Sequence, residues 1–178
     1  MAGLDQELND LRKRIDVLDK QIVRLLNQRT GCAMAIGRIK HQRGDAVFTP
    51  EREREVVERV TAASAGPLRA TELRAIYREI MSAAVAFEGG LMVGVLRADG
   101  AAGAWMARHR FGEGTVVRAF ASAKALAQAL ARGRIRLALI SSAQRKSLAR
   151  GLGVRDCGSL RLPGQAGSFV LLMAEKAT

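Results

Sequence analysis

Charged side chains interrupt the apolar faces predicted for the first ninety residues. Arg29 occupies a core position of an otherwise apolar repeat, and Lys40 follows eleven residues later. Eleven residues turn an α-helix by about 20° beyond whole turns, so both cations lie on one face, about three turns apart. Glu88 continues the apolar stripe of a later segment. Because a buried charge is costly unless it is paired or liganded, cations and a carboxyl group in this pattern predict a site for a small polyanion.

Structural explanations for the same residues stay open. An arginine at a heptad position is more often a snorkelling or ion-paired side chain than a ligand contact. The alternating charges of residues 52–55 are typical of a solvated helix face. Glu88 also fits an ordinary residue at a helix end.

A long helix must position Arg29 and Lys40. Apolar residues recur at alternating steps of four and three: Leu4, Leu8, Leu11, Ile15, Leu18, Ile22 and Leu25, continued in register by Arg29, Cys32, Ile36 and Ile39. The repeat predicts an amphipathic helix over residues 5 to about 42 with one face buried. At about 1.5 Å per residue it is longer than a compact domain of about 90 residues is wide, which favours packing against a second copy. In an antiparallel self-dimer, Arg12 of the partner subunit would approach Arg29 and Lys40.

Two shorter helices are predicted next. Thr49-Pro50-Glu51 is a start signal, with a hydroxyl N-cap, a proline in the first turn and an acid behind it, for a helix that runs to about Ala63. A further helix is predicted from about Ala70 to Phe87, and Gly89-Gly90 ends it.

The second half of the chain predicts a different architecture. Residues 92–96, 135–140 and 168–173 have the apolar composition of buried strands, and residues 101–109 and 122–132 have helical patterns. This alternation predicts a small α/β domain with a largely parallel sheet. We therefore divide the chain into an all-α domain, residues 1–89, and an α/β domain, residues 90–178.

Composition narrows the functional class. The chain has 178 residues and a net charge of +12, with Lys and Arg outnumbering Asp and Glu by 15 to 13 in residues 1–88 and by 14 to 4 in residues 89–178. The basic residues are scattered, so nucleic acid is not the expected partner. The only cysteines are Cys32 and Cys157, and they lack metal-ligand spacing. No apolar run approaches the roughly 20 residues of a membrane span, and the N-terminus is too polar for a secretory signal. We expect a cytoplasmic protein without a metal.

Five segments of the first half resemble the all-helical chorismate mutases, above all the mutase domain that precedes prephenate dehydratase in bifunctional enzymes. They are residues 11–19, 25–29, 36–40, 50–54 and 78–82, and the resemblance covers roughly residues 5–88. It implies an intertwined, three-helix homodimer that converts chorismate to prephenate in phenylalanine and tyrosine biosynthesis, without a cofactor.

The resemblance also implies roles for individual residues. Arg29, Lys40 and Glu88 would be catalytic: Arg29 would bind a substrate carboxylate, Lys40 a carboxylate and the ether oxygen, and Glu88 the ether oxygen from the other side. Glu88 replaces the glutamine of some members, so it must be protonated to donate this hydrogen bond. A Claisen rearrangement needs no nucleophile, which agrees with the absence of a convincing nucleophile–base pair.

The remaining implied contacts bind the substrate. Arg12 of the partner subunit would hold the second carboxylate, Arg52 would help enclose the substrate, and Glu53 would hold its ring hydroxyl. Ala84 would line the site where some members have a serine, and Thr49 stands where many have an aspartate. Both departures concern supporting positions.

The second half resembles the start of a prephenate dehydratase domain in shortened, degenerate form. Residues 93–96 and 138–142 carry the likeness. The Thr-Arg-Phe signature of the dehydratases is not found, and Gly167-Ser-Phe169 is its nearest match. Dehydratase activity is therefore not expected.

Two other functions fit the same sequence. The first is pyruvate elimination from isochorismate on the same helical fold. The second is a non-catalytic dimeric regulator whose basic module binds an acidic partner, which predicts salt-sensitive binding of polyanions and no turnover.

Overall fold

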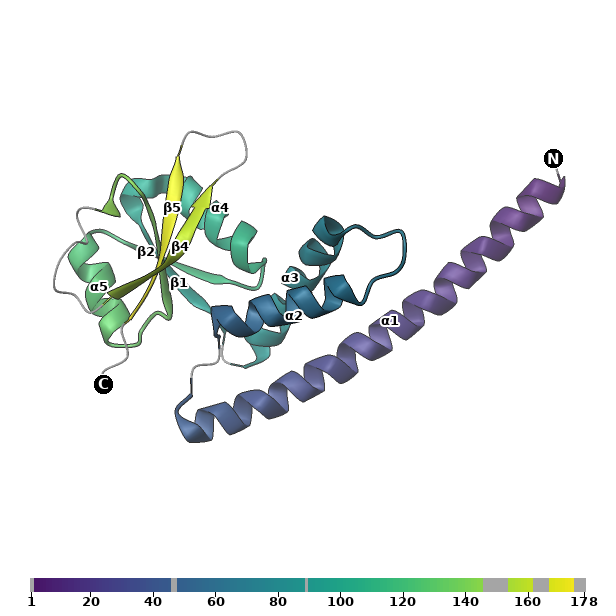
Figure 1. The fold of residues 1–178 in the computed structure, drawn as a ribbon, viewed down its shortest axis with the longest axis horizontal. Helices are drawn as coiled ribbons and strands as arrows, with labels where there is room; N and C mark the ends of the chain where they lie inside the picture. The colour runs from purple at the N-terminus through teal and green to yellow at the C-terminus, as the bar shows by residue number, and fades with distance from the viewer. Residues whose placement is uncertain (1, 46–47, 89, 146–153, 162–166, 175–178) are drawn as a thin grey trace.

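The computed structural model of the chain describes residues 2–45, 48–88, 90–145, 154–161 and 167–174. A helical N-terminal region precedes a small mixed α/β region (Figure 1). The helical region consists of α1 (Ala2–Arg43), α2 (Pro50–Ala62) and α3 (Ala70–Phe87). None of the helices in the described ranges is long and apolar enough to cross a membrane.

Helix α1 has 42 residues, which is about 63 Å at 1.5 Å per residue. It contains no proline, and its ends suit the helix dipole, with Asp5 in the first turn and Lys40, His41 and Arg43 in the last. Gly44 follows with a φ of 71°, a left-handed conformation that glycine adopts without strain. The N-terminal part of α1 extends away from the rest of the molecule (Figure 1).

The heptad stripe of α1 is not buried within the chain. Leu11, Ile15, Leu18, Ile22 and Leu25 are each about half exposed, as are Ile36 and Ile39 near the other end. Helix α1 packs against α3 instead through a different face, to which Leu26, Thr30, Ala33 and Gly37 belong. The stripe therefore remains available for a further contact.

Helices α2 and α3 begin and end close to the predicted residues. Pro50 occupies the first turn of α2 as expected, but the hydroxyl group of Thr49 makes no capping hydrogen bond, so this part of the prediction was wrong. At the start of α3 the Glu72 carboxylate accepts hydrogen bonds from the backbone N–H of Arg69 at 2.8 Å and from its Nε at 2.7 Å, contacts that the sequence analysis missed. Gly90, at a φ of 79°, donates its N–H to the carbonyl of Val85 at 2.9 Å and ends the helix.

The α/β region is a five-stranded mixed sheet in the order β2-β1-β3-β5-β4. Its elements are β1 (Met92–Leu96), the 3-10 turn η1 (Arg97–Asp99), α4 (Gly100–Phe111), β2 (Val116–Phe120), α5 (Ala123–Ala131), β3 (Leu137–Ser141), β4 (Val154–Arg161) and β5 (Ser168–Ala174). Strand β1 pairs in parallel with β2 and β3, whereas β5 pairs antiparallel with β3 and β4. The expectation of a largely parallel sheet thus holds for only one half of it.

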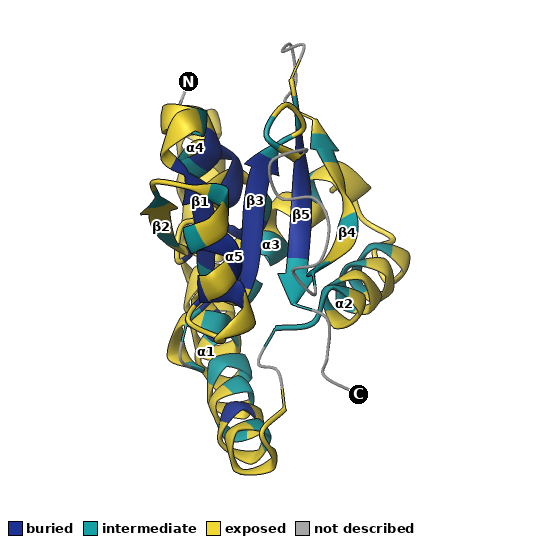
Figure 2. Cartoon of the chain, turned by 90° about the vertical axis from the view of Figure 1, so that its left-hand side faces the viewer, coloured by how far each residue is buried: buried dark blue, intermediate teal, exposed yellow. Residues whose placement is uncertain are grey.

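Side chains of the central strands form a core on each face of the sheet. One core joins α4 residues such as Met106 and Phe111 to Val93 and Leu139, and the other joins α5 residues such as Leu126 to Ile140. The buried residues gather in β1, β3, β5 and the helices over them, whereas α1 is mostly exposed and has its half-buried residues toward its C-terminal end (Figure 2).

Candidate functional site

Glu88 lies directly against α1 at the end of α3. A Cβ atom placed on Gly37 would come within 2.8 Å of the Cγ atom of Glu88 and within 3.1 Å of its Cβ atom. Gly37 is buried and Glu88 is partly buried. The missing side chain at position 37 is what allows α3 to bring this carboxyl group onto the surface of α1.

Two cations of α1 lie near enough to the same carboxyl group to act on its charge. Burial raises the pKa of Glu88, and the positive charges of Lys40 and Arg29 oppose this rise without cancelling it. Arg29 and Lys40 are both half-buried. The structure therefore brings together the three residues Arg29, Lys40 and Glu88, which the sequence analysis had selected as catalytic.

Ala84 lies one helical turn before Glu88 on α3 and is only 4% exposed. A methyl group at this position offers no hydrogen bond. Position 84 therefore contributes shape alone to its surroundings.

Arg12 and Arg52 lie outside this cluster in a single chain. Arg12 is exposed in α1, and its 17-residue separation from Arg29 is about 25 Å along the helix axis. Arg52 is exposed at the start of α2, where its guanidinium group pairs with Glu55 at 2.9 Å. The role expected for Arg12 belongs to the partner subunit, so a single chain does not test it, and the role expected for Arg52 stays a prediction.

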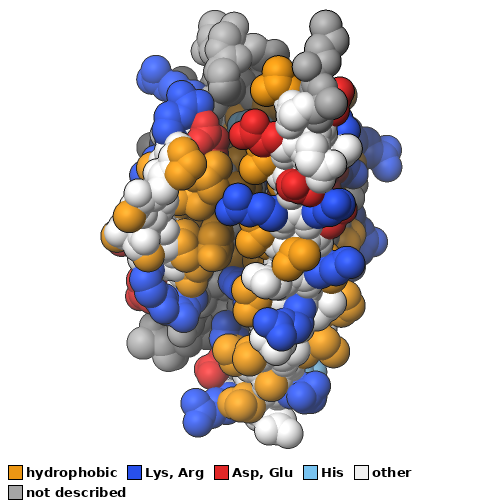
Figure 3. Space-filling model, turned by 90° about the vertical axis from the view of Figure 1, so that its right-hand side faces the viewer, with side chains coloured by type: hydrophobic (Ala, Val, Ile, Leu, Met, Phe, Trp, Pro, Cys, Tyr) orange, Lys and Arg blue, Asp and Glu red, His pale blue; other side chains and the backbone are white. Residues whose placement is uncertain are grey.

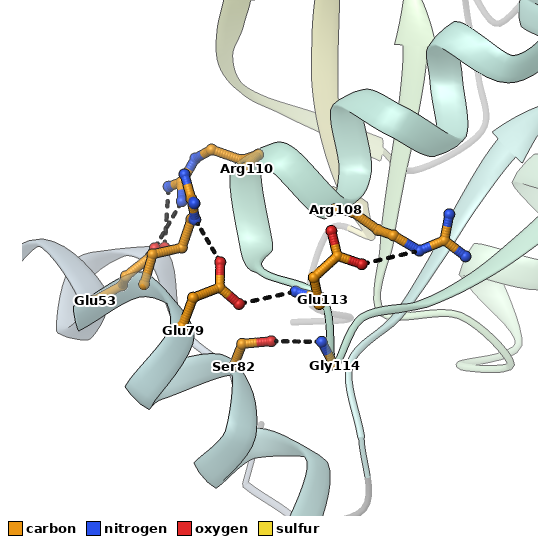
Figure 4. A network of polar contacts seen from close by, with 8 residues as sticks. Glu53, Glu79, Ser82, Arg108, Arg110, Glu113 and Gly114 are labelled. Carbon is orange, nitrogen blue, oxygen red and sulfur yellow. Dashed lines mark hydrogen bonds and ion pairs between the residues drawn. The ribbon is translucent and has the colours of Figure 1, made fainter. Parts of the chain in front are cut away.

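Glu53 forms an ion pair with a residue of the α/β region. Arg110 of α4 donates from Nη1 to Oε1 at 2.6 Å and from Nη2 to Oε2 at 3.0 Å, and the side chain of Glu53 is only 12% exposed (Figure 4). A bidentate pair of this kind fixes both the position and the orientation of the carboxylate. The α/β region therefore controls where Glu53 lies.

The loop after α4 reinforces this connection between the two regions. The backbone N–H groups of Glu113 and Gly114 donate to the Glu79 carboxylate and the Ser82 hydroxyl of α3, both at 3.1 Å (Figure 4). Gly112 has a φ of 90°, and a Cβ there would lie 2.4 Å from that of Ser82. The close approach of α3 to this loop requires glycine.

Sequence reasoning missed Arg110, Glu79 and Ser82. Arg110 and Glu53 are 57 residues apart and belong to different predicted domains, so no local pattern links them. Glu79 and Ser82 lie in the segment 78–82 that resembles the mutases, but their contacts with the loop after α4 are visible only in the three-dimensional structure.

In the described part of the chain, no group of three or more His, Cys, Asp or Glu side chains is arranged to hold a metal ion. Cys32 is exposed, Cys157 is half-buried, and both are free thiols. The cluster of Arg29, Lys40 and Glu88 can act on a ligand through charge and hydrogen bonds.

Comparison with known proteins identifies a family that matches part of this chain. Residues 11–89 match the family model described as chorismate mutase type II. A bifunctional chorismate mutase/prephenate dehydratase of Pseudomonas aeruginosa is 32% identical over 145 residues, which are 79% of this chain and 40% of that protein. This alignment is longer than the helical region, so it extends into the α/β region.

Two further comparisons concern the helical region. A bifunctional chorismate mutase/prephenate dehydratase of Aquifex aeolicus is 40% identical over 95 residues, 51% of this chain and 26% of that protein. The chain thus spans well under half the length of these two relatives. A chorismate mutase structure from Thermus thermophilus is 31% identical and covers 47% of this chain and 94% of its own, with a TM-score of 0.46. The helical region of this chain, residues 11–89, is a chorismate mutase type II domain.

Proposed function

We propose that this chain is an isomerase that converts chorismate to prephenate by an intramolecular Claisen rearrangement, as a step in aromatic amino-acid biosynthesis. The observation that carries the proposal is the Arg29, Lys40 and Glu88 cluster within a chorismate mutase type II domain. The reaction breaks a carbon–oxygen bond and forms a carbon–carbon bond within one molecule. It therefore needs a restrained conformer and stabilised charge rather than a nucleophile.

In this proposal, fixed cations provide both effects. Arg29 binds one carboxylate of chorismate and holds the substrate in its compact reactive conformer. Lys40 donates to a carboxylate and to the ether oxygen, on which negative charge develops as the bond breaks. A preorganised cation in a site from which water is excluded stabilises such charge more strongly than water does.

Glu88 donates the second hydrogen bond to the ether oxygen. Its carboxyl group must be protonated to donate, and the upward shift of its pKa supports this role. The cations beside it favour the ionised form, so the activity depends on how far burial outweighs them.

The active site is completed by a second subunit. The exposed stripe on α1 supports a homodimer, since a continuous apolar surface of this length marks an interaction site. Figure 3, seen from the free end of α1, shows hydrophobic side chains along this helix and in the hollow beside it. An antiparallel arrangement brings Arg12 of the partner subunit to the second carboxylate of the substrate bound by Arg29.

The other proposed contacts come from α2 and α3. Arg52 encloses the substrate after leaving its exposed pair with Glu55. Glu53 accepts a hydrogen bond from the ring hydroxyl of the substrate. A carboxylate has about four acceptor sites, and Arg110 uses only two of them. Ala84 provides an apolar wall.

The direct test is turnover of chorismate by the purified chain. Loss of chorismate absorbance should coincide with the appearance of prephenate in equal amount, with no added cofactor. Pyruvate from isochorismate would instead indicate the lyase reaction. Absence of turnover of either compound would refute the proposed chemistry.

A further inference from the structure

A cavity of about 510 Å³ lies between the helical region and the α/β region. Its walls come from α2, α3, α4 and the end of β4. This volume is in the range of small-molecule sites and exceeds the needs of a single inorganic ion. Arg29, Lys40 and Glu88 are not among the lining residues. Of the proposed substrate contacts only Glu53 lines the cavity, so the cavity adjoins the proposed active site at this residue.

Arginines dominate the charge of this cavity. Arg54, Arg74 and Arg161 reach it from α2, α3 and β4, and none of them has an ion-pair or hydrogen-bond partner for its side chain among the described residues. Arg78 and Arg110 also line the cavity, and they are paired with Glu79 and Glu53.

The acidic residues of the lining do not neutralise these cations. Glu53 is already neutralised by Arg110, and Glu58 on the exposed side of α2 is the other carboxylate. Several exposed arginines from separate elements line one cavity, and their planar guanidinium groups suit carboxylate and phosphate groups.

Much of the rest of the lining is apolar and favours a ligand with a carbon body in addition to its charged groups. Val57, Ala75, Met106 and Leu160 contribute apolar surface between the arginines. Met106 belongs to the core of the α/β region and is 2% exposed, so that core lies directly behind this part of the wall. An inorganic anion would leave that surface uncovered, whereas an organic acid would bury its carbon body against it.

We propose that this cavity binds a small organic polyanion, a compound whose carbon body carries two or more carboxylate or phosphate groups. Arg54, Arg74 and Arg161 bind the anionic groups, and the apolar wall holds the body. Because Arg110 lines the cavity as well as holding Glu53, the bound anion competes with Glu53 for this guanidinium group. The binding itself does not depend on the mutase activity.

The test is isothermal titration calorimetry of the full chain at constant ionic strength. Citrate and fructose 1,6-bisphosphate serve as probes for the carboxylate and the phosphate source. We expect saturable 1:1 binding of at least one probe. The Arg74→Ala/Arg161→Ala double variant should bind it about tenfold more weakly or worse, since each arginine contributes a charge-assisted hydrogen bond.

Matched variants make the result specific. Arg132→Ala/Arg134→Ala removes two exposed arginines outside the cavity and should bind as wild type does. Arg74→Lys/Arg161→Lys keeps the charge but loses the planar fork, so its affinity should lie between the two. Thermal unfolding without ligand checks that each variant is folded.

Three results would overturn the proposal. The first is that neither probe shows saturable binding to the wild type. The second is that the two alanine double variants bind with equal affinity. The third is that Arg29→Ala abolishes binding, which would locate the anion in the catalytic cluster. If the wild-type chain binds a probe saturably but does not convert chorismate to prephenate, the result would support the cavity and refute the proposed function. The two conclusions therefore fail separately.

Discussion

Gly37 of α1 and Glu88 at the end of α3 are in direct contact, and the glycine is the reason that the contact is possible. Any side chain at position 37 would approach the Cγ atom of Glu88 to 2.8 Å and its Cα atom to 3.4 Å. Those atoms are close to the backbone, so a small rotation of the carboxyl group would not relieve the clash. The position of Glu88 relative to Arg29 and Lys40 therefore depends on a missing methyl group.

Gly37→Ala should displace Glu88 and lower kcat/KM at least about tenfold, because a shift of about 1 Å in a catalytic group is costly. It should also lower the free energy of unfolding by about 1–3 kcal/mol through overpacking. Gly31→Ala is the control, since apart from the backbone of α1 no atom of the described residues lies within 4 Å of a Cβ there. It should keep the activity and gain up to about 1 kcal/mol from helix propensity. Equal activities of the two variants would contradict the proposed role of this contact.

The activity should fall as the pH rises through the raised pKa of Glu88, because only the protonated carboxyl group donates to the ether oxygen. The same shift affects stability: the folded state holds this proton more tightly, so the contribution is full at low pH and is lost as the pH rises through the folded-state pKa. Glu88→Gln should flatten the kcat profile on the alkaline side. A Gln variant with the same alkaline decline as wild type would show that another group titrates.

The limits of the helices were predictable because local signals mark them. Pro50 near the start of α2 and the glycines after Phe87 are such signals, and they act within a few residues. The proximity of Arg29 and Lys40 to Glu88 was also predictable, since helical periodicity and family resemblance pointed to the same positions.

The edge strands were not predictable from periodicity. Strand β2 and strand β4 lie at the two edges of the sheet and are mostly exposed, so neither has a continuous apolar run. Strand β5 was predicted, but its antiparallel direction depends on pairing partners distant in sequence. The Arg110–Glu53 ion pair was not predictable for the same reason, because its two residues are distant in sequence.

Arg110 and Glu53 should show strong energetic coupling in a double-mutant cycle with Arg110→Ala and Glu53→Gln. We expect a coupling of about 1–3 kcal/mol in the free energy of unfolding, because removal of Arg110 leaves a largely buried carboxylate without its partner. The exposed pair between Arg52 and Glu55 provides the comparison, and Glu55→Gln should cost less than about 1 kcal/mol. Chemical denaturation measures both. Additive effects of the first pair would mean that it does not hold the two regions together.

The proposed dimer should depend on the stripe of α1. Leu18→Asp places a charge on the stripe and should produce monomers in sedimentation velocity, whereas Lys20→Asp, two residues away on the outer face, should remain dimeric. If each site takes Arg12 from the partner subunit, inactive Arg12→Ala and Arg29→Ala chains should regain activity when mixed. Half of the dimers would then have one intact site, so about a quarter of the wild-type activity should return. No recovery after proven subunit exchange would argue against a shared site.

The most direct measurement is the rate of prephenate formation from chorismate by wild type, Arg29→Ala and Arg24→Ala. Both arginines belong to α1, but Arg24 is exposed and lies off the stripe, away from the Glu88 cluster. Arg29→Ala should lower kcat/KM by about 100-fold or more, the scale for loss of a preorganised charge, while Arg24→Ala stays near wild type. Equal rates in all three proteins, or no prephenate from wild type, would contradict the assignment of this cluster as the active site.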